Sequence, residues 1–279
     1  MSTLALKRLA KDWVPPAVHA SLRRHFRHRA PWEYVGDEWP QSDRRADGWN
    51  DASVTAVLEA QWPRYLELAR SAEPWAYWPW ATEGRDAAAQ HNLLAFAYCI
   101  ARIASETQRF SVLDWGGTFG HFASIACAAA PLANITYQVK DRPPICAIGS
   151  CLNPSVGFFD TDEAAFASRY SLVLASNALQ YSRDWRGTLS RLAGSATSWL
   201  LILALPTVRR SPDFVVVQRP RHVGFAEDYI SWVFNRDEFL SHIHSCGFGL
   251  EREFLSIGRL DAMHAPEVAE HAGFLFRRH

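Results

Sequence analysis

Short apolar runs alternate with amphipathic stretches from residue 108 to the end of the chain. Each apolar run has the length of one buried strand, and the longer stretches repeat their apolar positions with a helical period. The predicted strands cover 111–115, 135–139, 156–159, 172–175, 199–205, 250–257 and 273–276, and the predicted helices cover 121–130, 162–170, 184–193 and 235–246. This alternation is typical of an α/β fold in which a mostly parallel sheet has helices on both faces. The last two strands are predicted to form an antiparallel edge.

The first 107 residues have a different pattern. Apolar side chains recur every three to four residues over 54–68, and Asp51 is suited to cap the start of that helix. A second helix is predicted over 87–103, and most of the 12 tryptophans lie in this part of the chain. Such aromatic crowding either lines a site for a ring-shaped substrate or packs as core. We predict two regions: 1–107, a basic arm with a helical, tryptophan-rich cap, and 108–279, the α/β domain.

The N-terminal arm is rich in Lys and Arg, and Asp12 is its only acidic residue before Glu33. Leucines and aromatic residues are interleaved with the basic ones. Two interpretations are open. The arm is either an amphipathic segment that makes weak contact with an anionic membrane surface, or a solvated arm that docks on its own domain.

Charge and cysteine content exclude several classes of protein. The 29 Lys and Arg balance the 29 Asp and Glu, which argues against a nucleic-acid partner because phosphate neutralisation needs a basic surplus. The five cysteines are odd in number and lack C-x-x-C spacing, a pattern typical of a reducing compartment. No apolar run approaches the roughly 20 residues of a membrane span, and the N-terminus lacks the pattern of a secretory signal. A cytoplasmic location is predicted.

The strongest chemical signal is a glycine-rich turn directly after the first strand of the α/β domain. The strand ends at Asp114, and the residues of the turn are Gly116, Gly117, Thr118 and Gly120. Glycines let the backbone turn sharply and approach a ligand, here at the sheet edge where open α/β sheets bind cofactors. The spacing is neither G-x-G-x-x-G nor a P-loop. An acid directly before the glycines suits the ammonium group of S-adenosylmethionine.

A second signal is the position of Asp141, which follows the second predicted strand 21 residues after Gly120. An acid there accepts hydrogen bonds from ribose hydroxyls. Alternatively, it is a turn residue before Arg142-Pro143-Pro144. Together with the glycine-rich turn, the ribose role is favoured.

Five sequence blocks occur in order between Trp32 and Phe254: VLDWGGTFGHF, VKDRP, LVLASNALQY, VVVQRP and SWVF. With them the chain resembles S-adenosylmethionine-dependent methyltransferases of the Rossmann-like class. More narrowly, it is similar to a methyltransferase family of bacterial surface-polysaccharide gene clusters. The resemblance implies a Rossmann-like, seven-stranded, mostly parallel sheet that binds the cofactor at its strand ends. The implied contacts are Asp114, Gly116, Gly117, Thr118, Gly120 and Asp141, with Asp160 near the adenine and Ser176 and Asn177 beside the reacting centre.

The chain departs from this family where the fifth strand ends. The family has an Asp-Arg pair before Thr-Pro, whereas this sequence reads Ala204-Leu205-Pro206-Thr207. If the family's Arg anchors an anionic substrate, Arg209 or Arg210 in the following loop is a candidate substitute.

Candidate groups for handling an acceptor are few. Methyl transfer is an in-line displacement that needs alignment, and it needs a base only where the acceptor loses a proton. Gln180 and Tyr181 either orient an acceptor by hydrogen bonding or pack and cap a helix. His121 or His222 is a candidate base, and each is otherwise structural or solvated.

Gln218 and Trp232 flank an insertion at about 206–233, which is predicted to be a substrate loop. No metal site is predicted, because His242 and His244 are two residues apart on a predicted helix and do not face one side.

The function predicted from the sequence is that of an S-adenosylmethionine-dependent methyltransferase that O-methylates a saccharide or sugar-linked acceptor. Two alternatives stay open. One is a non-catalytic accessory protein that keeps the fold, and the other is a nicotinamide-dependent oxidoreductase.

Overall fold

The fold is described by a computed structural model for residues 31–41, 49, 51–74, 87–220 and 225–279. Seven adjacent strands of a ten-stranded sheet lie in the order β4-β3-β2-β5-β6-β10-β9. Their bounds are β2 Arg109–Trp115, β3 Asn134–Lys140, β4 Gly157–Phe159, β5 Tyr170–Ser176, β6 Ala196–Val208, β9 Phe248–Leu260 and β10 Ala269–Arg278. Strands β2 to β6 are parallel, and β10 runs antiparallel between β6 and β9. The predicted α/β class and antiparallel edge are confirmed, whereas the sheet has ten strands instead of the predicted seven.

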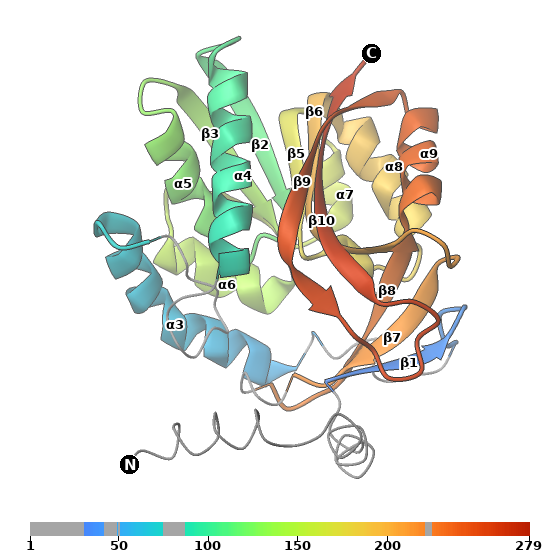
Figure 1. Ribbon diagram of the computed structural model, residues 1–279. Helices are drawn as coiled ribbons and strands as arrows, with labels where there is room; N and C mark the ends of the chain where they lie inside the picture. Colours follow the sequence, from blue (N-terminus) through green and yellow to red (C-terminus); the bar gives the residue numbers. More distant parts are fainter. Residues whose placement is uncertain (1–30, 42–48, 50, 75–86, 221–224) are drawn as a thin grey trace, which may run out of the picture.

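Helices cover both faces of this sheet (Figure 1). One layer consists of α4 Ala87–Ala104 and α5 His121–Ala129, and the other of α7 Asp162–Phe166, α8 Trp185–Ser195 and α9 Arg236–Ser245. Successive residues of a strand pack on opposite faces of the sheet. Val112 belongs to the core under α4 and α5, whereas Leu113 belongs to the core under α8 and α9. Burial on both faces explains why these strands appear in the sequence as continuous apolar runs.

Helix ends follow local chemistry. The Asp51 side chain accepts a hydrogen bond from the backbone N–H of Ser53 at 2.8 Å, and Asn235 caps α9 in the same way. Gly247 follows α9 with φ +83°, a left-handed conformation that suits a residue without Cβ. The helix α7 ends at Phe166, earlier than predicted, because β5 already begins at Tyr170.

Two helices lie at the carboxyl ends of the central strands, at the lower edge of the sheet in Figure 1. They are α3 Ala52–Arg70 and α6 Pro143–Leu152. The sequence analysis did not predict α6, because its two prolines were interpreted as part of a turn. Proline lacks only an N–H that the first helical turn would leave unpaired, so it can start a helix.

Most of the described part of 206–233 is strand and not loop, which corrects the sequence prediction. It holds the end of β6, all of β7 Phe214–Gln218 and most of β8 Tyr229–Asn235. Strands β7 and β8 pair antiparallel with each other, and β1 Trp32–Gly36 pairs with β7. β8 also continues alongside the end of β6, so these three strands extend the main sheet. The pattern was missed because the apolar run 214–217 of β7 is short and lies inside a segment rich in polar residues.

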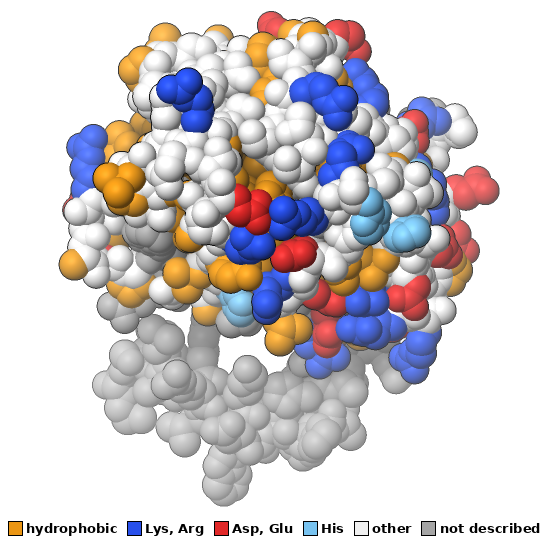
Figure 2. Space-filling model, turned by 90° about the horizontal axis from the view of Figure 1, so that it is seen from above, with side chains coloured by type: hydrophobic (Ala, Val, Ile, Leu, Met, Phe, Trp, Pro, Cys, Tyr) orange, Lys and Arg blue, Asp and Glu red, His pale blue; other side chains and the backbone are white. Residues whose placement is uncertain are grey.

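The outer surface of the described part of the chain carries mixed charge. Figure 2 shows acidic and basic side chains lying together on the face seen from above. Among the described residues, no helix is long and apolar enough to cross a membrane, and no group of three or more His, Cys, Asp or Glu is placed to hold a metal ion. The predicted basic arm lies outside the described residues.

Candidate functional site

The candidate site is the edge at which β2, β3, β4 and β5 end. Because these neighbouring strands are parallel and in register, their carboxyl ends meet there. The structure thereby brings most predicted site residues to one edge. They are Asp114, Gly116, Gly117, Thr118, Gly120, Asp141, Asp160, Ser176, Asn177, Gln180 and Tyr181.

The glycine-rich turn between β2 and α5 packs too tightly for side chains at two positions. Gly116 has φ +77°, and a Cβ there would lie 2.6 Å from the Cβ of Ala178, which follows β5. A Cβ on Gly117 would lie closer than 3.0 Å to the carboxyl group of Asp114. The glycines therefore let this turn lie directly against the end of β5 on one side and over Asp114 on the other.

Asp114 lies beneath the turn and is only 1% exposed. Its Oδ2 accepts a hydrogen bond from the Tyr137 hydroxyl at 2.9 Å. Burial raises the pKa of Asp114 to about 7, although the Tyr137 hydrogen bond opposes the rise. The sequence analysis expected this carboxylate to face a cofactor ammonium, whereas the structure buries it as a support for the turn.

Asp141 binds the turn from the other side. Its Oδ2 accepts a hydrogen bond from the backbone N–H of Thr118 at 2.9 Å, and its Oδ1 accepts one from that of Arg142 at 2.7 Å. A carboxylate oxygen accepts more than one hydrogen bond, so these contacts leave capacity for hydroxyl donors. Asp141 therefore fixes the glycine-rich turn relative to β3 while it lies at the edge.

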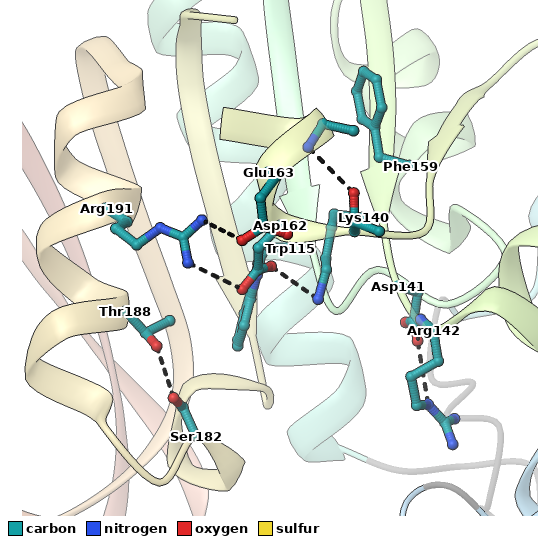
Figure 3. A network of polar contacts seen from close by, with 12 residues as sticks. Trp115, Lys140, Asp141, Arg142, Phe159, Asp162, Glu163, Ser182, Thr188 and Arg191 are labelled. Carbon is teal, nitrogen blue, oxygen red and sulfur yellow. Dashed lines mark hydrogen bonds and ion pairs between the residues drawn. The ribbon is translucent and has the colours of Figure 1, made fainter. Parts of the chain in front are cut away.

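A polar network joins the ends of β2, β3 and β4 (Figure 3). Asp162 Oδ1 accepts from the Trp115 indole N–H and from Lys140 Nζ, both at 2.9 Å, and Arg191 lies 3.7 Å from its Oδ2. Burial raises the pKa of Asp162, but the Lys140 and Trp115 hydrogen bonds outweigh it and hold this pKa below its usual value. The sequence analysis missed this network, which anchors α7 directly after the exposed Asp160.

At the end of β5 and in the turn that follows it, one polar residue has a positive φ and two buried polar atoms lack a hydrogen-bond partner among the described residues. Asn177 has φ +51°, and its backbone N–H donates to the carbonyl of Leu203 at 2.9 Å. The Gln180 Nε2 donates to Asn177 Oδ1 at 2.6 Å. The Oε1 of Gln180 and the Oγ of Ser176 are buried without a hydrogen-bond partner among the residues that the structure describes.

Tyr181 connects this turn to β7. Its hydroxyl donates to Gln218 Oε1 at 3.2 Å, and its ring packs against Trp49 and Tyr229. Burial raises the pKa of Tyr181 well above its ordinary value, so the hydroxyl keeps its proton at neutral pH. Tyr181 and Gln218, which were separate candidates in the sequence, thus come together across 37 residues.

Trp232 does not join them. It is buried, its ring lies 5.8 Å from that of Trp39, and its indole N–H donates to the backbone carbonyl of Arg183 at 3.2 Å. These contacts are those of a core residue. His222, a candidate base, lies outside the described residues.

The helix α3 covers the glycine-rich turn. The Trp62 and Tyr65 rings pack against His121 at centroid distances of 5.1 and 4.7 Å, and the Tyr65 hydroxyl donates to the His121 carbonyl. The Nδ1 of His121 lies 2.7 Å from Thr118 Oγ1. Burial lowers the pKa of His121 to about 3, so the imidazole is neutral at physiological pH and too weak to serve as an efficient base.

The Arg209 and Arg210 segment has a partner within the chain. The Glu267 carboxylate accepts hydrogen bonds from three consecutive backbone N–H groups, those of Arg209, Arg210 and Ser211. Arg210 Nε also lies 3.7 Å from Glu267. This segment is bound to the connection between β9 and β10, which does not support its proposed role as an anchor for an anionic substrate.

The fold is that of class I S-adenosylmethionine-dependent methyltransferases. Magnesium protoporphyrin IX methyltransferase from Synechocystis PCC 6803, with bound S-adenosylmethionine, is 12% identical and superposes with a TM-score of 0.51 over 86% of this chain and 100% of its own. The 1,6-didemethyltoxoflavin-N1-methyltransferase from Burkholderia thailandensis is also 12% identical, with a TM-score of 0.48 over 90% of this chain and 96% of its own. No protein-family model and no curated protein matches the sequence.

Proposed function

We propose that this protein is a methyltransferase that uses S-adenosylmethionine. The observation that carries the proposal is the convergence of the glycine-rich turn, Asp141 and the turn after β5 at one edge of a sheet with the class I methyltransferase fold. Open α/β sheets bind their ligands at this edge. The structural neighbour from Synechocystis holds S-adenosylmethionine, which agrees with this choice of cofactor.

The residues at this edge fit the cofactor. The Gly116 backbone lies against Ala178 without an intervening Cβ, and the Asp141 carboxylate has capacity left for ribose hydroxyls. The exposed Asp160 lies after β4, where the adenine is expected, and Ser176 keeps an unpartnered hydroxyl beside the turn. Asp114 contributes by supporting the turn rather than by contact with the ammonium group.

The bound cofactor would supply an electrophilic methyl group on a positively charged sulfur. The chain's own residues would then align the acceptor and exclude water. Gln180 and the protonated Tyr181 would orient an acceptor, and α3 covers the turn with Trp62 and Tyr65. His121 is neutral and held by Thr118, which favours a role in shaping the turn over proton abstraction.

For the acceptor, we extend the proposal to a saccharide or sugar-linked molecule that is O-methylated in the cytoplasm. Two observations support it: the resemblance to proteins of surface-polysaccharide gene clusters, and the ring of aromatic side chains beside Gln218. The rings of Trp49 and Tyr181 lie 4.9 Å apart and are only partly buried, with the core residue Tyr229 behind them, and we infer that they would contact the apolar face of a sugar ring.

Calorimetric titration with S-adenosylmethionine and S-adenosylhomocysteine tests the cofactor. We expect the wild-type chain to bind both, and Gly116→Ala to lose binding because its Cβ would collide with Ala178 at a φ of +77°. Gly194→Ala is the matched control, since a Cβ there meets nothing within 4 Å. A wild-type chain that binds neither compound would refute the proposal, and a fluorescence titration with reduced nicotinamide cofactor would then test the oxidoreductase alternative.

A further inference from the structure

Two polar atoms on the turn after β5 are buried without a partner. They are Ser176 Oγ and Gln180 Oε1, and neither forms a hydrogen bond with any residue in the described ranges. The two residues are 8% and 2% exposed. A buried polar atom left unpaired costs free energy, so a partner is expected for it, and a ligand or a reacting group at this edge of the sheet would supply one.

The orientation of the Gln180 side chain is fixed by its neighbour. Its Nε2 donates to Asn177 Oδ1 at 2.6 Å, and the Asn177 backbone N–H is in turn bound to Leu203 at 2.9 Å. With the nitrogen engaged in this way, Gln180 presents its carbonyl oxygen, which accepts hydrogen bonds and cannot donate them. The matching group on a ligand must therefore be a donor.

The position of these two atoms relates them to the proposed chemistry. Ala178 lies between Ser176 and Gln180 in sequence, and it is the residue against which Gly116 packs. The unpartnered atoms therefore belong to the residues two positions before and two positions after this contact between the two turns. Tyr181 follows directly, with a protonated hydroxyl that is already bound to Gln218.

Among the residues that the structure describes, the neighbouring charges do not favour an anionic group. Arg219 follows Gln218, but its guanidinium is paired with Glu33 and lies 3.7 Å from Asp228. A carboxylate placed against Gln180 Oε1 would be repelled, because both groups can only accept hydrogen bonds. Arg219 would not offset this repulsion, because its charge is already neutralised. A hydroxyl or amine would instead donate a hydrogen bond.

We propose that Gln180 Oε1 accepts a hydrogen bond from the reacting group of the acceptor, and that this group is a neutral hydroxyl or amine rather than a carboxylate. The inference rests on the proposed methyltransferase function. In the transfer, a lone pair on the acceptor's oxygen or nitrogen forms the new bond to the methyl carbon. The carbon–sulfur bond breaks with its electrons on sulfur, and the proton of the reacting group passes to water. The Ser176 hydroxyl, the other unpartnered atom, would bind the same group.

The first test needs no acceptor. If the Ser176 hydroxyl is kept for a ligand, its removal relieves an unpaired polar atom, and Ser176→Ala should raise the melting temperature of the ligand-free protein by about 2–4 °C. The matched control is Ser195→Ala, because Ser195 is also buried but its hydroxyl donates to the Leu192 carbonyl at 3.0 Å. Loss of this hydrogen bond should lower the melting temperature. An unchanged or lower melting temperature for Ser176→Ala would show that the hydroxyl is already paired and would overturn the inference.

The second test compares acceptors that share one ring: glucose, glucosamine and glucuronate. Transfer of labelled methyl to a hydroxyl or amine, giving a product stable to mild alkali, is the expected result. An alkali-labile methyl ester on glucuronate, or no transfer to any hydroxyl or amine by a protein that binds S-adenosylmethionine, would overturn the inference. Failure of the wild type to bind the cofactor would instead refute the proposed function, and the Ser176 result would stand separately.

Variants at Gln180 complete the test. Gln180→Met should lower kcat/KM for the methylated acceptor at least about tenfold, because one buried hydrogen bond is lost. Gln180→Glu keeps an acceptor oxygen and should retain more of the activity than Gln180→Met. Cofactor affinity should stay within about twofold of wild type in both variants. Gln108→Met, at an exposed position before β2, is the control. Equal activity of Gln180→Met and wild type would contradict the proposed contact.

Discussion

Asp114 allows a quantitative prediction, because its carboxyl group is buried under the glycine-rich turn with one hydrogen-bond donor, the Tyr137 hydroxyl. Burial raises its pKa from 3.8 to about 7. A rise of this size favours the protonated form of the folded protein by ~4 kcal/mol. The unfolded chain ionises near the ordinary value, so the stabilisation from the protonated group is fully present below about pH 4 and is lost as the pH rises to about 7.

Asp114→Asn removes this ionisation while it keeps an oxygen that can accept from Tyr137. We expect the variant to match the wild type near pH 4. At pH 8 it should be more stable by up to ~4 kcal/mol, or about 10 °C in melting temperature. Thermal unfolding followed by circular dichroism between pH 4 and pH 8 measures both effects.

Asp162→Asn is the matched control, because Lys140 and Trp115 hold the pKa of Asp162 below its usual value. Its loss should lower stability at neutral pH, and the difference should shrink as the pH falls below about 4. If Asp114→Asn showed the same dependence of stability on pH as the wild type, Asp114 would not be the buried, reluctantly ionised group inferred here.

Three further variants test the packing around the site. Gly117→Ala should lower the free energy of unfolding, measured with urea, by more than about 2 kcal/mol, because its Cβ would collide with the Asp114 carboxyl. An unchanged urea midpoint would contradict the tight packing of the turn. Ala204→Gly should stabilise the protein by about 1 kcal/mol in the same assay, since Ala204 has φ +53°, and a loss of stability would show that this strain is not real. Tyr65→Phe should lower the free energy of unfolding by about 1 kcal/mol, because it removes the hydrogen bond to the His121 carbonyl. Backbone amides of α3 should then exchange hydrogen faster. Unchanged exchange in Tyr65→Phe would argue against that anchor.

The sequence by itself determined the central sheet. Strands such as β5 are buried on both faces, so every residue from Leu172 to Ala175 must be apolar, and such a run is visible without a structure. The glycine-rich turn and the cap at Asp51 were equally visible, because they depend on backbone conformation and on hydrogen bonds to residues two or three positions away.

Tertiary structure alone decided the rest. Whether Asp114 faces a ligand or lies beneath the turn depends on Tyr137, 23 residues away on another strand. The pairing of Tyr181 with Gln218 depends on β7, whose partner strands no local pattern identifies. The same holds for His121, which is kept neutral by rings from α3. Local periodicity reports which face of an element is buried, whereas the protonation and hydrogen bonding of a site depend on groups that only the folded chain brings together.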